Sequence, residues 1–84
     1  MSKIKNYKEI ILQGIPLINS WLNKQPEQIQ ITEDYKELKR VITEIEEEQD
    51  YSEQSYLDII YLLKPFESLS LEIKRKFNVS TMDH

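Results

Sequence analysis

Apolar residues recur along the first part of the chain at the spacing of one helix face. At 100° per residue they form a stripe that keeps its phase across Pro16 and consists of Ile4, Tyr7, Ile11, Ile15, Ile18 and Leu22. Pro16 has no N–H to bond the carbonyl of residue 12, so it should kink or break a helix. Because the phase continues, the pattern favours one kinked helix over residues 3–23, with a break before Pro16 as the alternative.

A second, narrower stripe predicts a surface helix over residues 32–48. Residues 24–31 before it are expected to form a loop, in which Ile29 and Ile31 alternate with glutamine like an extended segment lying across the bundle. Thr32 is a good N-cap, and acids follow it where they favour the helix dipole. The apolar edge of this helix consists of Tyr35, Leu38, Val41, Ile42 and Ile45.

The third predicted helix, residues 51–64, is apolar on nearly every side. The run Asp50-Tyr51-Ser52-Glu53 resembles a capping box headed by aspartate, and Pro65 disfavours helix in the residue before it. Between Tyr56 and Leu63 the only polar residue is Asp58. A helix of this kind is normally buried. In so short a chain it must be either the central helix or a helix with one face for its neighbours and one for a partner.

A short fourth helix over residues 70–77 completes the expected fold. Ser68 or Ser70 can cap it, and its apolar side consists of Leu69, Ile73, Phe77 and Val79. The 84 residues are enough for one small domain. The sequence therefore predicts an all-α fold over residues 1–84, a small bundle of three main helices plus a short C-terminal helix in roughly up-down order.

Composition argues against catalysis. The chain has no Cys, one Gly (Gly14) and one His, which is the last residue, His84. These counts leave no nucleophile-and-base pair built on Cys or His, no thiolate metal site and no glycine-rich phosphate loop. We expect no enzymatic activity, no cofactor and no metal.

The net charge of −4 is unevenly distributed. Residues 1–42 carry seven bases and five acids, whereas residues 43–84 carry four bases and ten acids. An acidic half disfavours nucleic-acid binding and suits a basic protein partner. The longest apolar run, Ile59 to Leu63, is far shorter than a membrane span, so we expect a cytoplasmic protein without membrane contact.

The strongest local anomaly is an acidic run at the C-terminal end of the second predicted helix: Glu44, Glu46, Glu47, Glu48 and Asp50. Acids are unfavourable there because the C-terminal end of a helix carries partial negative charge. One hypothesis is a docking patch for a basic partner. A divalent cation site is not expected, because calcium and magnesium sites normally draw their ligands from loops or several helices. The plain alternative is that solvent, or Lys74, Arg75 and Lys76, screens these charges.

Aromatic and apolar residues beside the acidic run supply candidate contact area. Tyr51, Leu57 and Tyr61 are the candidates, because the other predicted stripes cannot cover every side of the third helix. Tyr56 is expected in the core with its hydroxyl at the surface, and Trp21 at the edge of the core.

The segment from Leu69 to Thr81 resembles the first helix and turn of a helix-turn-helix motif. Ile73 and Phe77 stand where that motif packs, and Asn78 stands where its turn glycine usually lies. The resemblance implies a DNA-binding regulator, or a truncated relative of one, that would use Lys74, Arg75 and Lys76.

The leading functional hypothesis is a small acidic module that binds a protein partner stoichiometrically, as inhibitors, immunity proteins, antitoxins and phage anti-host proteins do. Its partner-binding residues would be Glu44, Glu47, Glu48, Asp50, Tyr51, Leu57 and Tyr61. The alternatives are the DNA-binding regulator and a homodimeric assembly subunit with the third helix as its interface.

Overall fold

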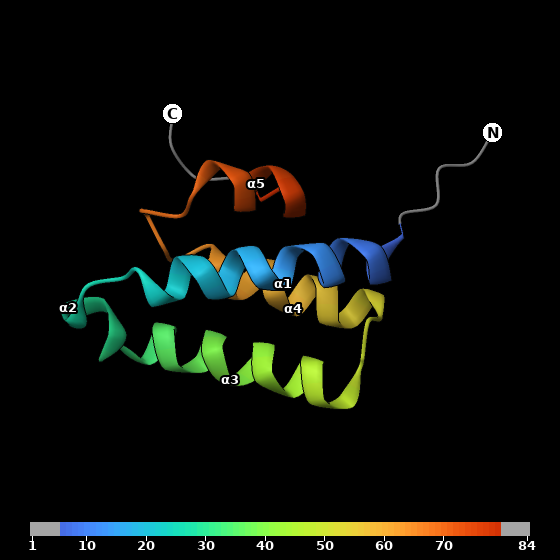
Figure 1. Ribbon diagram of the computed structural model, residues 1–84, viewed down its shortest axis with the longest axis horizontal. Coiled ribbons are helices and arrows are strands. Elements are labelled where there is room, and N and C mark those ends of the chain that lie inside the picture. Colours follow the sequence, from blue (N-terminus) through green and yellow to red (C-terminus); the bar gives the residue numbers. More distant parts are fainter. Residues whose placement is uncertain (1–5, 80–84) are drawn as a thin grey trace.

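Helices account for the regular structure of residues 6–79, the part of the chain that the computed structural model describes. Within this range there are five helices and no strand: α1 (Tyr7–Asn23), α2 (Glu27–Gln30), α3 (Glu33–Glu48), α4 (Glu53–Leu63) and α5 (Leu71–Phe77). The four longer helices run in up-down order, as Figure 1 shows. The predicted all-α bundle is therefore confirmed.

The central helix is α1, which packs against α3, α4 and α5. In Figure 1, α5 lies on one side of α1 and α3 on the other, while α4 packs against both α1 and α3. The shared core contains Ile11, Ile18, Leu22, Leu38, Ile42, Ile59, Leu63, Ile73 and Phe77, each with at most 1% of its surface exposed. The predicted apolar sides of the first, second and last helices supply all of these residues except Ile59 and Leu63, which come from the helix predicted to be apolar on nearly every side.

Side-chain caps fix where the helices begin. Thr32 caps α3, as predicted, and of the two caps considered for α5 it is Ser70 rather than Ser68; each accepts a hydrogen bond from the backbone N–H three residues on. The start of α1 was predicted at residue 3, but Asn6 is a non-helical cap that accepts from the N–H of Glu9. The rest of that prediction, including Ile4, lies outside the described residues.

The start of α4 also differs from the prediction. Ser52 rather than Asp50 is the N-cap, and its hydroxyl accepts from the N–H of Ser55. Gln49 adopts a left-handed conformation that ends α3, and the N–H of Asp50 then bonds the carbonyl of Ile45. The Asp50 backbone thus closes the preceding helix, and α4 begins two residues later than expected.

The connection between α1 and α3 holds a single helical turn, α2, instead of the predicted extended loop. Pro26 precedes this turn, and its carbonyl accepts from the N–H of Gln30. The fixed φ of proline suits a residue at the start of a helix, and alternation of Ile with Gln was too short a pattern to exclude a turn. As a result Ile31 is 67% exposed and does not cover the bundle.

Pro16 does not interrupt α1, which is continuous from Tyr7 to Asn23. The proline is exposed, on the side of the helix away from the core. The favoured prediction of one helix rather than two pieces is confirmed, because the apolar face on both sides of Pro16 packs into one core.

Three aromatic side chains donate hydrogen bonds to backbone carbonyls of other segments of the chain. The Tyr35 hydroxyl donates to the Leu22 carbonyl at 3.2 Å, and the Tyr56 hydroxyl donates to the Phe77 carbonyl at 3.1 Å. The indole Nε1 of Trp21, itself buried, donates to the Ser68 carbonyl at 3.1 Å. The Phe77 carbonyl belongs to the last turn of α5, where carbonyls lack partners within the helix, so the Tyr56 hydroxyl satisfies a buried group that burial would otherwise penalise.

The hydroxyl of Tyr56 was predicted at the surface, and that prediction was wrong. The side chain is 4% exposed, and its ring lies 4.9 Å from the ring of Tyr7 and 6.2 Å from that of Phe77. A tyrosine can be buried completely when its hydroxyl finds a partner, here the last carbonyl of α5. Tyr56 therefore ties α4 to α5.

Replacing Tyr56 with phenylalanine should lower the free energy of unfolding by about 0.5–1.5 kcal/mol, because the buried Phe77 carbonyl loses its donor. Urea denaturation followed by circular dichroism measures the change. Tyr61→Phe is the control, since Tyr61 is 74% exposed and its hydroxyl can bond water in both states. Equal stability of the two variants would contradict the assigned hydrogen bond.

Candidate protein-docking groove between α3 and α4

The two faces of α4 differ in burial. Tyr56, Ile59 and Leu63 point into the core, whereas Leu57 is 47% and Tyr61 74% exposed. Of the two arrangements that the sequence left open, the one with α4 as the central helix is wrong, because α1 takes the central place. The structure matches the other expected arrangement, in which α4 packs on its neighbours with one face and presents apolar side chains on the other.

A groove of about 380 Å³ runs between α3 and α4. Its apolar lining comes from Val41 and Ile45 of α3 and from Leu62 of α4. Ser55, the one buried polar residue among the described residues, also lines it. A serine is much smaller than the apolar residues around it, so its place in this lining leaves room between the two helices. Tyr61 stands at the exposed edge of the same groove.

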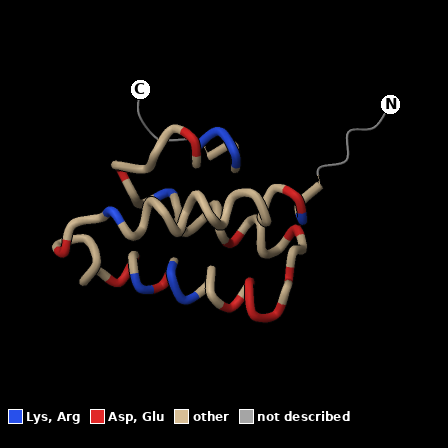
Figure 2. The backbone as a smooth tube through the Cα atoms, in the orientation of Figure 1, with Lys and Arg blue, Asp and Glu red and all other residues tan. Residues whose placement is uncertain are grey.

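Carboxylates from three successive elements converge on this groove. They are Glu37, Glu44 and Glu48 of α3, Asp50 of the connection and Asp58 of α4. The only base in the lining is Arg40. Figure 2 shows acidic residues gathered at the end of α3 and along the connection to α4. The lining therefore combines an apolar surface with a strong excess of negative charge.

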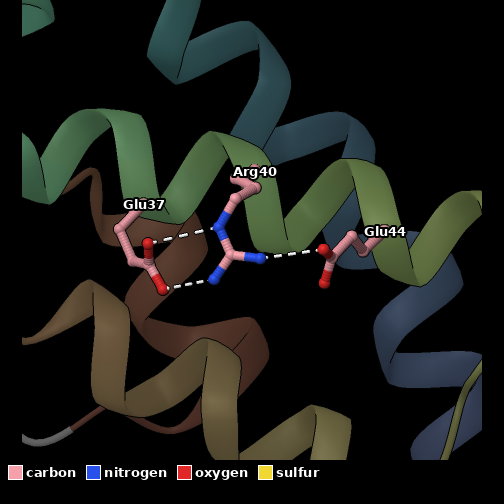
Figure 3. A network of polar contacts seen from close by, with 3 residues as sticks. All are labelled: Glu37, Arg40 and Glu44. Atoms are coloured by element: carbon pink, nitrogen blue, oxygen red, sulfur yellow. Dashed lines mark hydrogen bonds and ion pairs between the residues drawn. The ribbon is translucent and has the colours of Figure 1, made fainter.

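Arg40 pairs with two of these carboxylates along the surface of α3. Its guanidinium donates from Nη2 and Nε to Glu37, at 2.6 and 3.3 Å, and from Nη1 to Glu44 at 2.8 Å (Figure 3). The hydrogen bonds and charge of Arg40 lower the pKa of Glu37, and those of Glu37 and Glu44 raise the pKa of Arg40. Of the other three groove carboxylates, Asp58 accepts a hydrogen bond from the neutral side-chain amide of Gln54 at 3.0 Å. Within residues 6–79, neither Glu48 nor Asp50 forms a salt bridge.

Replacing Arg40 with glutamine should raise the pKa of Glu37 toward its usual value, because the hydrogen-bonding cation is removed. Carboxyl carbon shifts followed by NMR through an acid titration measure this pKa in the variant and in the wild-type protein. A depressed folded-state pKa stabilises the protein above the unfolded pKa, and that contribution is lost as the pH falls through the folded value. An unchanged Glu37 titration would contradict the network in Figure 3.

Of the partner-binding residues predicted from the sequence, the structure brings four together in the groove: Glu44, Glu48, Asp50 and Tyr61. The other three do not line it. Glu47 is exposed elsewhere on α3, Tyr51 is half-buried against the core, and Leu57 is exposed on α4. Sequence reasoning did not assign Glu37, Asp58 or Leu62 to the site. Asp58 carried a usable signal, since it is the one charge inside the apolar run of α4.

The basic residues of the DNA-binding alternative lie on α5. This helix packs against α1, on the side away from α3, so Lys74, Arg75 and Lys76 lie apart from the acidic run (Figure 2). The Nζ of Lys76 donates to Oε1 of Gln13 at 2.6 Å. All three bases fall in the last turn of α5, where positive charge is favourable to the helix dipole. Asn78 ends the helix in a left-handed conformation.

Residues 6–79 contain neither a cluster of metal ligands nor a helix that could span a membrane. No group of three or more acidic or histidine side chains is placed to hold a metal ion in this range. None of the helices described combines the length and hydropathy required to cross a bilayer.

Comparisons with known proteins give no relative for this chain. No family model, no curated protein and no solved structure matches it.

Proposed function

We propose that this protein is a non-catalytic module that binds a basic protein partner stoichiometrically through the groove between α3 and α4. The observation that carries the proposal is the joint lining of that groove. It offers apolar side chains, an exposed tyrosine and five carboxylates against one guanidinium. Protein interfaces combine buried apolar area with aromatic residues, and complementary charge speeds encounter and sets specificity.

The cost of the acidic residues to the fold supports a role in binding. Glu48 lies in the last turn of α3, which contains no base, so it opposes the helix dipole, and it also lines the groove. Among the acidic run of residues 44–50, the one residue in a salt bridge is Glu44, which lies one turn earlier and pairs with Arg40. An acidic residue that destabilises a helix end and has no partner within the protein has a reason to be there if it binds another molecule.

A stoichiometric binder of this size fits the inhibitor class, which includes immunity proteins, antitoxins and phage anti-host proteins. A small acidic domain can block a basic functional surface by occupying it, with no chemistry of its own. We propose a cytoplasmic location for the same module.

Affinity capture from the source cells tests the proposal. Immobilised wild-type protein should retain a basic partner near one-to-one stoichiometry. The variant E48K/D58K should lose it, because two of the groove carboxylates are reversed. E46K/E47K is the matched control, since it changes the net charge equally at exposed positions outside the groove. Equal retention by both variants, or no partner retained by the wild type, would contradict the proposed function.

A further inference from the structure

We infer that the occupant of the groove is an amphipathic helix of the partner protein, with its basic residues gathered at the end that meets the α3–α4 connection. The inference rests on the proposed function and adds the shape, polarity and register of the partner segment. It comes from three properties of the groove: its walls, its uneven charge and the position of Arg40.

The walls of the groove favour a helix as its occupant. They are two consecutive helices in up-down order, and side chains of a third helix can pack between the ridges of two others. No strand edge is present in residues 6–79 to pair with an extended peptide. The 11 residues of α4 set the length at about 16 Å, which corresponds to about three turns of a partner helix.

Charge is unevenly distributed along the groove. Glu48 is the last residue of α3 and Asp50 lies in the connection, so both stand at the end where α3 turns into α4. Arg40, two turns earlier on α3, already pairs with Glu37 and Glu44 and offsets one of their two negative charges. The unpaired negative potential is therefore greatest near the turn, and Lys or Arg side chains of an occupant gain most there.

Arg40 acts as a specificity determinant for the direction of the occupant. A basic side chain placed at its end of the groove would face a guanidinium, whereas an apolar one can lie against Val41, Leu62 and Tyr61. Like charges brought together at an interface are costly and suppress wrong registers. The occupant is thus oriented with its bases toward Asp50 and its apolar residues toward Leu62.

A second copy of this chain fits the groove poorly. A dimer with the two grooves face to face would bring carboxylates against carboxylates. The net charge of −4 adds to that repulsion. Charge complementarity therefore selects a basic partner over self-association.

The inference is tested by NMR titration of the full-length, ¹⁵N-labelled protein with three synthetic peptides of about 12 residues. The first has leucines on one helical face and lysines gathered at one end, the second has glutamate in place of lysine, and the third is a scrambled form of the first. The first peptide should shift amide signals of residues 41, 45, 48, 58 and 62 and bind at least about tenfold more tightly than the others.

Variants of the protein add the charge and register controls. E48K/D58K should lower the affinity for the first peptide by at least about tenfold, whereas E46K/E47K should change it by less than about threefold. Arg40→Gln should let a peptide with lysines at the opposite end bind about as tightly as the first. Equal binding of the scrambled peptide, or shifts confined to residues outside the groove, would overturn the inference.

Failure of the helix inference can be told apart from failure of the proposed function. If E48K/D58K loses the native partner but no helical peptide binds the groove, the partner presents another shape and only the helix inference fails. If capture of the native partner does not depend on the groove carboxylates, the proposed function fails, and the inference that depends on it fails too.

Discussion

Replacing Ile59 with alanine is expected to lower the free energy of unfolding by about 2–5 kcal/mol. Ile59 is fully buried on the inner face of α4, so truncation removes apolar contacts and leaves a cavity. A domain of this size has a total stability on the order of 5–15 kcal/mol, so the loss is a large fraction of it. Urea denaturation followed by circular dichroism at 25 °C gives the value.

Leu57→Ala is the matched control for Ile59→Ala, because it truncates an apolar side chain of the same helix on the exposed face. Its expected effect on stability is within about 0.5 kcal/mol, as for surface substitutions generally. Similar losses for the two variants would mean that α4 is covered on both faces. The groove and the exposed residues beside it would then not be accessible to a partner.

Replacing Gly14 with alanine should destabilise the protein, although alanine is the better helix former. A Cβ at this position would lie 2.2 Å from Cζ and 2.4 Å from Cε2 of Phe77, whose ring is fully buried. Overpacking a core costs about 1–3 kcal/mol, and Gly to Ala within a helix gains about 1 kcal/mol. Because the overlap is so large, we expect a net loss of about 1–2 kcal/mol, measured by urea denaturation.

Two further variants isolate the contact between α1 and α5. Ser20→Ala lies at an exposed position of α1, so it changes helix propensity without an overlap and should leave stability nearly unchanged. Phe77→Leu replaces the ring that meets Gly14 with a smaller side chain. In this background Gly14→Ala should therefore lower the free energy of unfolding by less, with a coupling energy of about 0.5–3 kcal/mol. Independent effects of the two substitutions would contradict the close approach at this point.

The sequence was sufficient to predict the helices with long, regular stripes. The apolar faces of α1 and α3 repeat over four or more turns, and core packing enforces the same period, so their C-terminal ends at Asn23 and Glu48 were predicted correctly. The error at the start of α4 arises because two residues were candidates for the same cap. Ser52 rather than Asp50 caps α4, because the left-handed turn at Gln49 uses the Asp50 N–H to close α3.

Burial around α4 could not be predicted from its own sequence. Nearly every position from Tyr56 to Leu63 is apolar, so the pattern contains no phase that tells the inner face from the outer one. Which face is covered depends on the positions of α1 and α3. The same arrangement placed the Tyr56 hydroxyl against the last carbonyl of α5, a partner 21 residues away in the chain.

Only part of the candidate site could be predicted, because its residues are brought together by the packing of α4 against α3. The acidic run identified the end of α3, but successive helical residues point about 100° apart, so only the position of α4 decides which acids share a groove. Glu44 and Glu48, one turn apart, line it, whereas Glu47 does not. Asp58 joins them from α4, and no local pattern links it to the acidic run.

The docking site is tested most directly by photocrosslinking from defined positions to the captured partner. Benzoylphenylalanine in place of Tyr61 puts the crosslinker at the groove on an exposed aromatic position, and the same group in place of Leu71 puts it on α5. We expect a one-to-one crosslinked product from position 61, lost on adding E48K/D58K, and none from position 71. Crosslinking from position 71 alone would contradict a binding site between α3 and α4.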